Sequence, residues 1–394
     1  MHIAILSRGP RLYSTVRLKQ AAAERGHKVK VLDTLKFALY LEQGGPDLTY
    51  AGRRIRHYDA VIPRIGNSIT SFGSSVVRQF EQMGSYCVNT ASAILASRDK
   101  LAALQALSRH DLGIAHTAFV RSPKDILHAI HSMGGAPVVI KLLSGTQGIG
   151  VILAESNKVA EAIIETLSSV KQDVLVQNFV SESKGRDIRA FVIGDKVVAA
   201  MRRTAAGQEF RSNVHRGGTT QVVQLDPEYE RTAVRAAQIL NLNVAGVDML
   251  EGKDGPVIME VNSSPGLEGI EAATGMDIAG ELIRFMEDQI QFGNFDVRER
   301  LTLTRGYTIS EFTVQPHSDM VGRTISESGL RELDIVVLRI VRGGEQIANP
   351  RFDREIMAGD VLMCYGNMNA LRAFLPEHAH SRRKKSRRKP NPKN

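Results

Sequence analysis

Three oxygen-bearing side chains on two apolar segments are the residues of this chain best suited to chemistry. Asp248 interrupts an apolar run at residues 244–250, and Glu260 and Asn262 lie in a second run at residues 257–262. Residues two apart on a strand point to the same face, so the last two side chains converge. A buried carboxylate is costly unless it is paired or binds a cation, and these oxygens suit Mg²⁺ held against nucleotide phosphates. The alternative is three unrelated polar residues at strand ends.

A glycine-rich segment at residues 144–150 offers a second binding element. It includes Gly148, lies between two apolar runs and is preceded by Lys141. Glycines let a backbone approach phosphates closely and point N–H groups at them, and the lysine can add a cation. The segment is neither a Walker A motif nor a dinucleotide fingerprint, because the spacing of both differs. By itself it is equally consistent with a flexible turn.

Two further sets of basic residues have a functional and a structural interpretation. Lys100 falls in a helical stretch, Ala91–His110, where a lone lysine is usually a surface residue. A cluster at residues 210–218 can neutralise phosphates or carboxylates through charge-assisted hydrogen bonds, or it can be an exposed basic loop. The polar residues of this cluster are Arg211, Asn213, His215 and Arg216.

Composition and charge restrict the class of protein. Of 394 residues 43% are hydrophobic and 24% charged, as in soluble globular proteins, and no apolar run reaches the length of a membrane span. The net charge is +9, but residues 382–394 hold eight Lys/Arg and no acid, which leaves +1 for the rest. The first seven residues indicate a strand rather than a signal peptide, and Cys87 and Cys364 lie in apolar runs as buried free thiols. We therefore expect a cytoplasmic protein without a membrane segment.

Alternating strand and helix signals predict the architecture. Over the first ninety residues the alternation favours a mostly parallel sheet covered by helices. Strand and helix signals continue to residue 290, periodicity is lost at 291–307, and a smaller unit rich in β signals follows. We predict five segments: 1–95, 96–290, the linker 291–307, 308–376 and a basic disordered tail at 377–394.

Six motifs occur in order in the first three quarters of the chain: Ile5–Arg8, Val61–Gly66, Arg98–Lys100, Gly145–Val151, Phe210–Gly218 and Ser264–Glu271. Together they resemble the RimK family of ATP-grasp enzymes, which modify a ribosomal protein by adding glutamate to its C-terminus. The resemblance implies a parallel-sheet pre-ATP-grasp domain, then a two-subdomain ATP-grasp fold of the α+β type that holds ATP between its halves.

The same resemblance implies a nucleotide site. Related enzymes often carry Glu where this chain has Asn178, so backbone groups can serve the adenine there in place of the side chain. The implied ATP-binding residues are Lys100, Lys141 and Gly148 at the phosphates, Gln177, Asn178, Phe179 and Val180 at the adenine, and Asp187 near the ribose.

It also implies the metal and catalytic residues. Asp248, Glu260 and Asn262 would bind two Mg²⁺ ions, with Glu260 shared between them and Mn²⁺ as an alternative metal. Arg211 and Asn213 would face the transferring phosphate as catalytic residues.

The implied reaction joins a carboxylate to an amine. The acceptor carboxylate attacks the γ-phosphoryl group of ATP, and the glutamate amine then displaces phosphate from the acyl phosphate. No covalent protein nucleophile is needed. We predict a clamp for the glutamate and acceptor carboxylates, formed by Arg202, Arg203, His215 and Arg216.

The C-terminal unit and the tail are additions to this plan. Residues 308–375 resemble the TrkA-C (RCK-C) domain, with motifs at 312–314, 321–325 and 358–362. That resemblance implies a small α+β domain that binds an anionic effector or assembles a homo-oligomer, and a passive stabilising domain is the alternative. The basic tail can attract RNA and bring the enzyme to ribosomes, or it can be a solubilising run of charge.

The favoured function is therefore an ATP-dependent glutamate ligase that acts on a small-subunit ribosomal protein. One alternative is a related ligase that uses a small molecule or a carrier protein, and another is synthesis of free polyglutamate. The alternative from a different class is a nucleotide-gated sensor or RNA-binding regulator.

Overall fold

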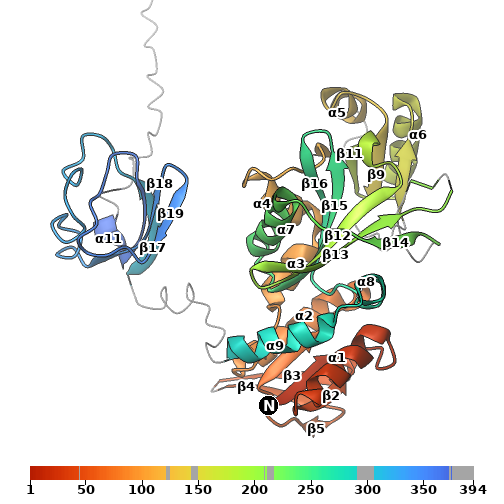
Figure 1. Ribbon diagram of the computed structural model, residues 1–394, viewed down its shortest axis with the longest axis horizontal. Coiled ribbons are helices and arrows are strands. Elements are labelled where there is room, and N and C mark those ends of the chain that lie inside the picture. The colour runs from red at the N-terminus through yellow and green to blue at the C-terminus, as the bar shows by residue number, and fades with distance from the viewer. Residues whose placement is uncertain are drawn as a thin grey trace, which may run out of the picture. The chain divides into compact units, whose positions relative to one another are not determined.

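The computed structural model describes residues 1–43, 45–120, 125–142, 150–207, 209–210, 217–290, 306–371 and 374. Two compact units, Met1–Asn294 and Phe295–Asn394, make up the chain (Figure 1). Within the described residues no helix combines the length and the apolar character needed to cross a membrane. Cys87 and Cys364 are both buried thiols that form no disulfide, as the sequence predicted.

The first unit begins with a parallel sheet in the order β2-β1-β6-β7. From β1 the chain crosses through α1 to β2 on one side and later returns to β6 on the other. The carboxyl ends of β1 and β6 therefore border the crevice where such sheets bind ligands. The elements are β1 (His2–Leu6), α1 (Tyr13–Glu24), β2 (Lys28–Leu32), β6 (Ala60–Pro63), α2 (Thr70–Gln82) and β7 (Tyr86–Cys87), with a small sheet of β3 (Phe37–Glu42), β4 (Gly45–Tyr50) and β5 (Arg53–Arg54).

A break at Asp99 divides the next helical stretch, which the sequence predicted as one helix from Ala91 to His110. The structure has α3 (Ala91–Arg98) and α4 (Lys100–Ser108) instead. The Asp99 carboxylate accepts the N–H groups of Leu101 and Ala102, both at 3.0 Å, and so caps α4. This cap places Lys100 in the first turn of α4.

An antiparallel sheet in the order β10-β9-β11-β8 follows. Apolar side chains on one face of β9 and β11 pack against α5 and α6. The elements are β8 (Thr117–Phe119), α5 (Ile126–Ser132), β9 (Val138–Leu142), β10 (Val151–Ala154), α6 (Asn157–Ser169) and β11 (Val174–Asn178).

The largest sheet has five strands in the order β14-β13-β12-β15-β16. Small side chains of α7 pack on one face, and α8 and α9 pack on the other beside the N-terminal sheet (Figure 1). The elements are β12 (Arg186–Ile193), β13 (Lys196–Thr204), β14 (Thr219–Val222), α7 (Pro227–Ile239), β15 (Val244–Gly252), β16 (Gly255–Asn262), α8 (Glu268–Thr274) and α9 (Ile278–Ile290).

The second unit contains an antiparallel sheet in the order β17-β20-β18-β19. Arg342 donates to both carboxylate oxygens of the buried Asp360 at 2.8 Å, which ties β18 to the turn before β20. The elements are β17 (Tyr307–Thr313), β18 (Ile335–Arg342), β19 (Glu345–Ala348), β20 (Val361–Asn367) and α11 (Met368–Leu371). The mixed α/β architecture with a parallel N-terminal sheet and a small C-terminal sheet confirms the predicted fold class.

Asn89 fastens the N-terminal sheet to the strands of the predicted metal site. Its amide donates to the carbonyl groups of Val244 and Ser263 at 2.7 and 2.9 Å. Its oxygen accepts the N–H groups of Asn243 and Val244 at 2.9 and 3.0 Å. A single buried side chain thus holds the start of β15 and the residue that follows β16.

We predict that Asn89→Ala lowers the free energy of unfolding by roughly 2–4 kcal/mol, because it leaves several buried backbone groups without partners. Urea denaturation followed by circular dichroism measures the change. Gln105→Ala, at an exposed position of α4, is the matched control and should stay within about 0.5 kcal/mol of the parent. Equal stability of the two variants would contradict the fastening role of Asn89.

Candidate functional site

The three predicted metal ligands lie on one face of two paired strands. Asp248 on β15 is directly opposite Glu260 on β16, and Gly246 is opposite Asn262. A bulge changes the register just beyond the first of these pairs, on the side away from Asn262. Because Glu260 and Asn262 are two residues apart, the structure brings the three side chains to the same part of the sheet.

Asp248 is buried inside an ion network that the sequence did not predict. Its carboxylate, 3% exposed, accepts two hydrogen bonds from Arg189, both at 2.7 Å. Arg203 contacts the same carboxylate at 2.9 Å and donates to Asp187 at 2.6 and 2.8 Å. Two arginines and two aspartates on three neighbouring strands therefore cancel each other's charge.

The protonation of this network is fixed by its opposite charges. Burial alone would raise the pKa of Asp248, but Arg189 and then Arg203 outweigh burial and hold that pKa below its usual range. Burial alone would likewise lower the pKa of Arg203, but Asp248 and Asp187 raise it. Asp248 and Arg203 are consequently both charged at neutral pH.

The donor set at this position fits a hard divalent cation. A carboxylate offers about four lone-pair positions, and guanidinium N–H groups of two arginines use three of those on Asp248. Glu260 is exposed, and none of the ion pairs found among the described residues includes it. One remaining position on Asp248, the carboxylate of Glu260 and the amide oxygen of Asn262 form the mixed oxygen set that Mg²⁺ accepts. Within the part of the chain that the structure describes, no group of three or more His, Cys, Asp or Glu is arranged to hold a metal, and the set at Glu260 includes an amide.

Two lysines from different elements approach Glu260. Lys100 of α4 donates from Nζ to the carbonyl of Leu142 at 2.8 Å, and Lys141 lies on β9 on the face that α5 and α6 leave open. Burial lowers the pKa of both ammonium groups, and the negative charge of Glu260 partly offsets this. For Lys141 the result is a pKa of about 8, to which the charge of Lys100 also contributes. The site thus pairs oxygen ligands with nearby cations, as a polyphosphate requires.

The predicted adenine segment runs from the end of β11 into a short 3-10 turn. Gln177 is buried and donates to the Thr117 hydroxyl at 2.8 Å. Asn178 instead points to the helix-covered face, where its amide donates to the carbonyl of Met133 at 2.7 Å. The backbone N–H groups of Asn178 and Phe179 are also bonded, to His116 and Pro137. The N–H of Val180 has no acceptor among the described residues and is the group left for a ligand.

Of the predicted clamp residues the structure describes two, Arg202 and Arg203, and it places them on opposite faces of β13. Adjacent residues on a strand point to opposite faces, so Arg202 lies across β13 from Arg203. Arg202 pairs with Glu251 at 2.7 Å on the α7 side, and Arg203 belongs to the buried network. The remaining predicted residues of the loops, Gly148, Arg211, Asn213, His215 and Arg216, lie outside the described residues.

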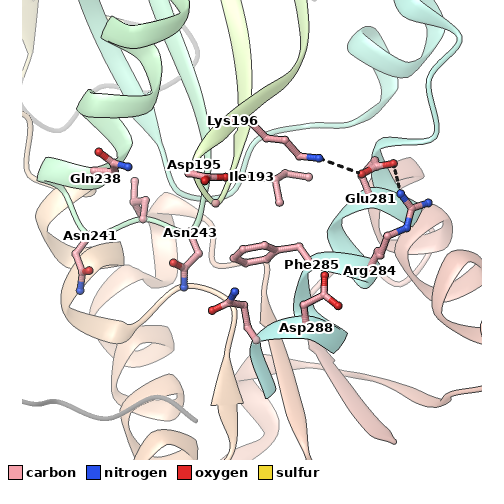
Figure 2. A pocket seen from close by; sticks show the side chains of 13 residues that line it. Ile193, Asp195, Lys196, Gln238, Asn241, Asn243, Glu281, Arg284, Phe285 and Asp288 are labelled. Carbon is pink, nitrogen blue, oxygen red and sulfur yellow. Dashed lines mark hydrogen bonds and ion pairs between the residues drawn. The ribbon is translucent and has the colours of Figure 1, made fainter. Parts of the chain in front are cut away.

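A cavity of about 550 Å³ lies elsewhere in the first unit, between the β12–β13 turn and α9 (Figure 2). Glu281 in its wall contacts Arg284 at 2.7 Å and Lys196 at 3.9 Å, so these charges satisfy each other. None of its lining residues belongs to the predicted site. The cavity is therefore separate from the residues grouped around Glu260.

Family models match nearly the whole chain. Residues 1–94 match the RimK PreATP-grasp domain, residues 97–286 the RimK-like ATP-grasp domain and residues 309–378 the TrkA-C domain. A protein of Rhodopirellula baltica named "Probable alpha-L-glutamate ligase" is 62% identical over 384 residues, which is 98% of this chain and 95% of the relative. A protein of the same name from Vibrio parahaemolyticus is 57% identical over 73% of this chain and 95% of its own length. About a quarter of this chain thus has no counterpart in the Vibrio relative.

Solved structures share the fold of the first unit. A RimK-domain ATP-grasp protein of Sphaerobacter thermophilus is 26% identical with a TM-score of 0.56, over 72% of this chain and 99% of that chain. The ATP-grasp ligase PsnB in complex with a precursor peptide and AMPPNP is 21% identical with a TM-score of 0.59, over 74% of this chain and 98% of that chain. At 21% identity, the similarity to PsnB shows a shared fold and nothing more.

We predict that Lys141→Met stabilises the nucleotide-free protein by roughly 1–3 kcal/mol below pH 8. The folded chain holds the Lys141 proton less tightly than the unfolded chain does, so the charged form costs stability, and this cost disappears as the pH rises from about 8 toward the ordinary lysine value. Thermal unfolding between pH 7 and 10 measures the difference. The same variant should lose most of the stabilisation that Mg²⁺ and AMPPNP give the parent.

Lys158→Met, at an exposed position of α6, is the control for this experiment. It should change neither the pH dependence nor the response to AMPPNP. A Lys141→Met protein that is less stable than the parent at pH 7, or that still responds fully to AMPPNP, would show that this lysine does not face a phosphate site.

Proposed function

We propose a function from one premise: this chain belongs to the RimK-like ATP-grasp family. It is an ATP-dependent carboxylate–amine ligase, and we propose that the amine is that of glutamate and the carboxylate the C-terminus of a protein. The names of the Rhodopirellula and Vibrio relatives support glutamate as the amino acid. The observation that carries the proposal is the pair of lysines that approaches Glu260 beside two further oxygen ligands.

In this proposal each described group has one task. Lys100 and Lys141 would contact the phosphates of ATP, and Asp248, Glu260 and Asn262 would hold two Mg²⁺ ions. Bound Mg²⁺ would offset negative charge on the transferring phosphoryl group. The backbone of the Gln177–Val180 segment receives the adenine, with the Val180 N–H as its free donor.

The chemistry needs two carboxylic substrates close together. The acceptor carboxylate oxygen attacks the γ-phosphorus, the bond to the β-phosphate oxygen breaks, and ADP and an acyl phosphate result. The glutamate nitrogen then attacks the acyl carbon, loses a proton, and phosphate leaves with the oxygen of the broken C–O bond. Holding both substrates in place supplies much of the rate advantage. Arg211 and Asn213 are the proposed catalytic groups at the phosphate.

We propose a small-subunit ribosomal protein as the acceptor and Arg203, His215 and Arg216 as groups that meet substrate carboxylates. For Arg203 this requires partial release from Asp187 or Asp248, which the structure pairs with it. The eight basic residues of 382–394 support a ribosomal setting, because they can neutralise RNA phosphates. For the TrkA-C unit we propose assembly of a homo-oligomer or binding of a small anionic effector.

We predict that turnover requires ATP, Mg²⁺, L-glutamate and a glutamate-terminated peptide together, and that Glu260→Gln lowers kcat at least about 100-fold. Because Glu260 is exposed, the variant should keep the parent Tm. ADP release and peptide mass measure the reaction. Glu165→Gln, at an exposed position of α6, should behave as the parent.

Two other outcomes of this assay would contradict parts of the proposed function. ADP release without any peptide would replace the protein acceptor by synthesis of free polyglutamate. Absence of ADP under every combination of substrates would contradict the ligase and favour a nucleotide-gated sensor.

Truncation tests the C-terminal additions. We predict that removing residues 382–394 leaves the reaction on free peptide unchanged but slows modification of intact small ribosomal subunits, and that raising the salt concentration abolishes the difference. Removing residues 308–394 should in addition change the oligomeric mass or the response to added anions. If the full chain and both truncated proteins show identical rates, oligomeric masses and responses to anions, the proposed roles of the tail and of the TrkA-C unit are both contradicted.

A further inference from the structure

Two arginines stand together at the edge of the N-terminal sheet without a carboxylate partner. Arg64 directly follows β6 and donates to the carbonyl of Pro265 at 2.8 Å. Arg98 ends α3 and donates to the carbonyl of Ile65 at 2.7 Å. Among the described residues neither guanidinium forms an ion pair, and both contact only backbone oxygens.

This arrangement differs from that of other partly buried arginines in the same unit. Arg17, Arg189 and Arg203 each contact at least one carboxylate at 3.3 Å or closer. A buried charge without a counterion is costly, so proteins usually pair it or use it. Arg64 and Arg98 therefore keep a desolvation cost that Arg17, Arg189 and Arg203 offset with carboxylate partners.

The surroundings of the two groups confirm that this cost is present. Burial lowers the pKa of Arg64 to about 10, and the nearby positive charge of Arg98 lowers it further. Burial also lowers the pKa of Arg98, with a partial offset from Glu260. The Nε of Arg98 is buried and has no hydrogen-bond partner in the described structure. Two like charges with unused donor capacity are thus held side by side.

Their position places them next to the proposed phosphoryl-transfer site. Arg64 follows the carboxyl end of β6, at the crevice between β1 and β6. The carbonyl that it binds belongs to Pro265, which packs so closely on Gly246 that a Cβ there would lie 2.8 Å from the proline ring. Gly246 is two residues from Asp248, and Arg98 lies within the field of Glu260.

We propose that Arg64 and Arg98 form a subsite that binds a substrate carboxylate beside the metal strands. A carboxylate would match two neighbouring guanidinium groups through charge-assisted hydrogen bonds and would remove the repulsion between them. In the ligation reaction such a group belongs either to free glutamate or to the acceptor chain. The inference rests on the proposed function for this choice of substrates, but not on the reaction taking place.

Binding to the full chain tests the subsite independently of turnover. With Mg²⁺ and AMPPNP present, calorimetry gives the Kd of L-glutamate and of a glutamate-terminated peptide. Arg64→Met and Arg98→Met should each raise one of these Kd values roughly 10- to 100-fold, as expected for the loss of hydrogen bonds to a charged group. The ligand whose Kd rises identifies the source of the carboxylate. Arg64→Lys keeps the charge but loses the planar guanidinium with its paired N–H donors. Its Kd should fall between those of the parent and Arg64→Met.

Controls separate a binding role from a structural one. The Kd of AMPPNP should stay within about twofold of the parent in every variant, and Arg78→Met, at an exposed position of α2, should leave all Kd values unchanged. Unchanged Kd values for glutamate and peptide in both methionine variants would overturn the subsite. So would a parent protein that binds neither ligand at millimolar concentration. Binding in this experiment, together with no ADP release in the assay with ATP, would instead contradict the ligase and leave the subsite standing.

Discussion

The buried Asp248 carboxylate, held between Arg189 and Arg203, is the interaction on which the candidate site depends. It joins β12, β13 and β15 across one face of the central sheet, and Asp187 completes its charge balance. Because the network is neutral, the sheet can place a carboxylate in its interior and still leave one oxygen position for a cation. The exposed carboxylate of Glu260 can then interact with Lys100, Lys141 and a bound ligand.

The charged side chains of the site thus fall into two sets, those paired with an opposite charge and those that are not. Within the buried network Asp187, Arg189, Arg203 and Asp248 each have a partner of opposite charge, which fixes the geometry of three strands. Outside this network, Lys100 and Lys141 have lowered pKa values, and Arg64 and Arg98 form no ion pair among the described residues. These costs are what bound anions would relieve. We propose that nucleotide phosphates bind at the two lysines and a substrate carboxylate at the two arginines.

Sequence patterns predicted the elements better than the contacts between them. The period of two along residues 257–262 was enough to place Glu260 and Asn262 on one face. Pairing of Asp248 with Arg189 depends on strand order, which no local pattern contains, although the spacing of Asp187 and Arg189 shows that both share a face. Arg202 and Arg203 were predicted to act in one clamp, whereas their side chains lie on opposite faces of β13. The cap at Asp99 also divided a helix that apolar periodicity alone had joined.

The central claim is that Asp248, Glu260 and Asn262 hold the cation that binds the phosphates of ATP. Its most direct test is a crystal structure of the full chain with AMPPNP and Mn²⁺, in which anomalous scattering locates the metal. The account predicts manganese about 2.0–2.3 Å from oxygens of all three side chains, with Lys141 on the nucleotide phosphates. Manganese bound to other residues, or a nucleotide bound far from these three side chains, would contradict it.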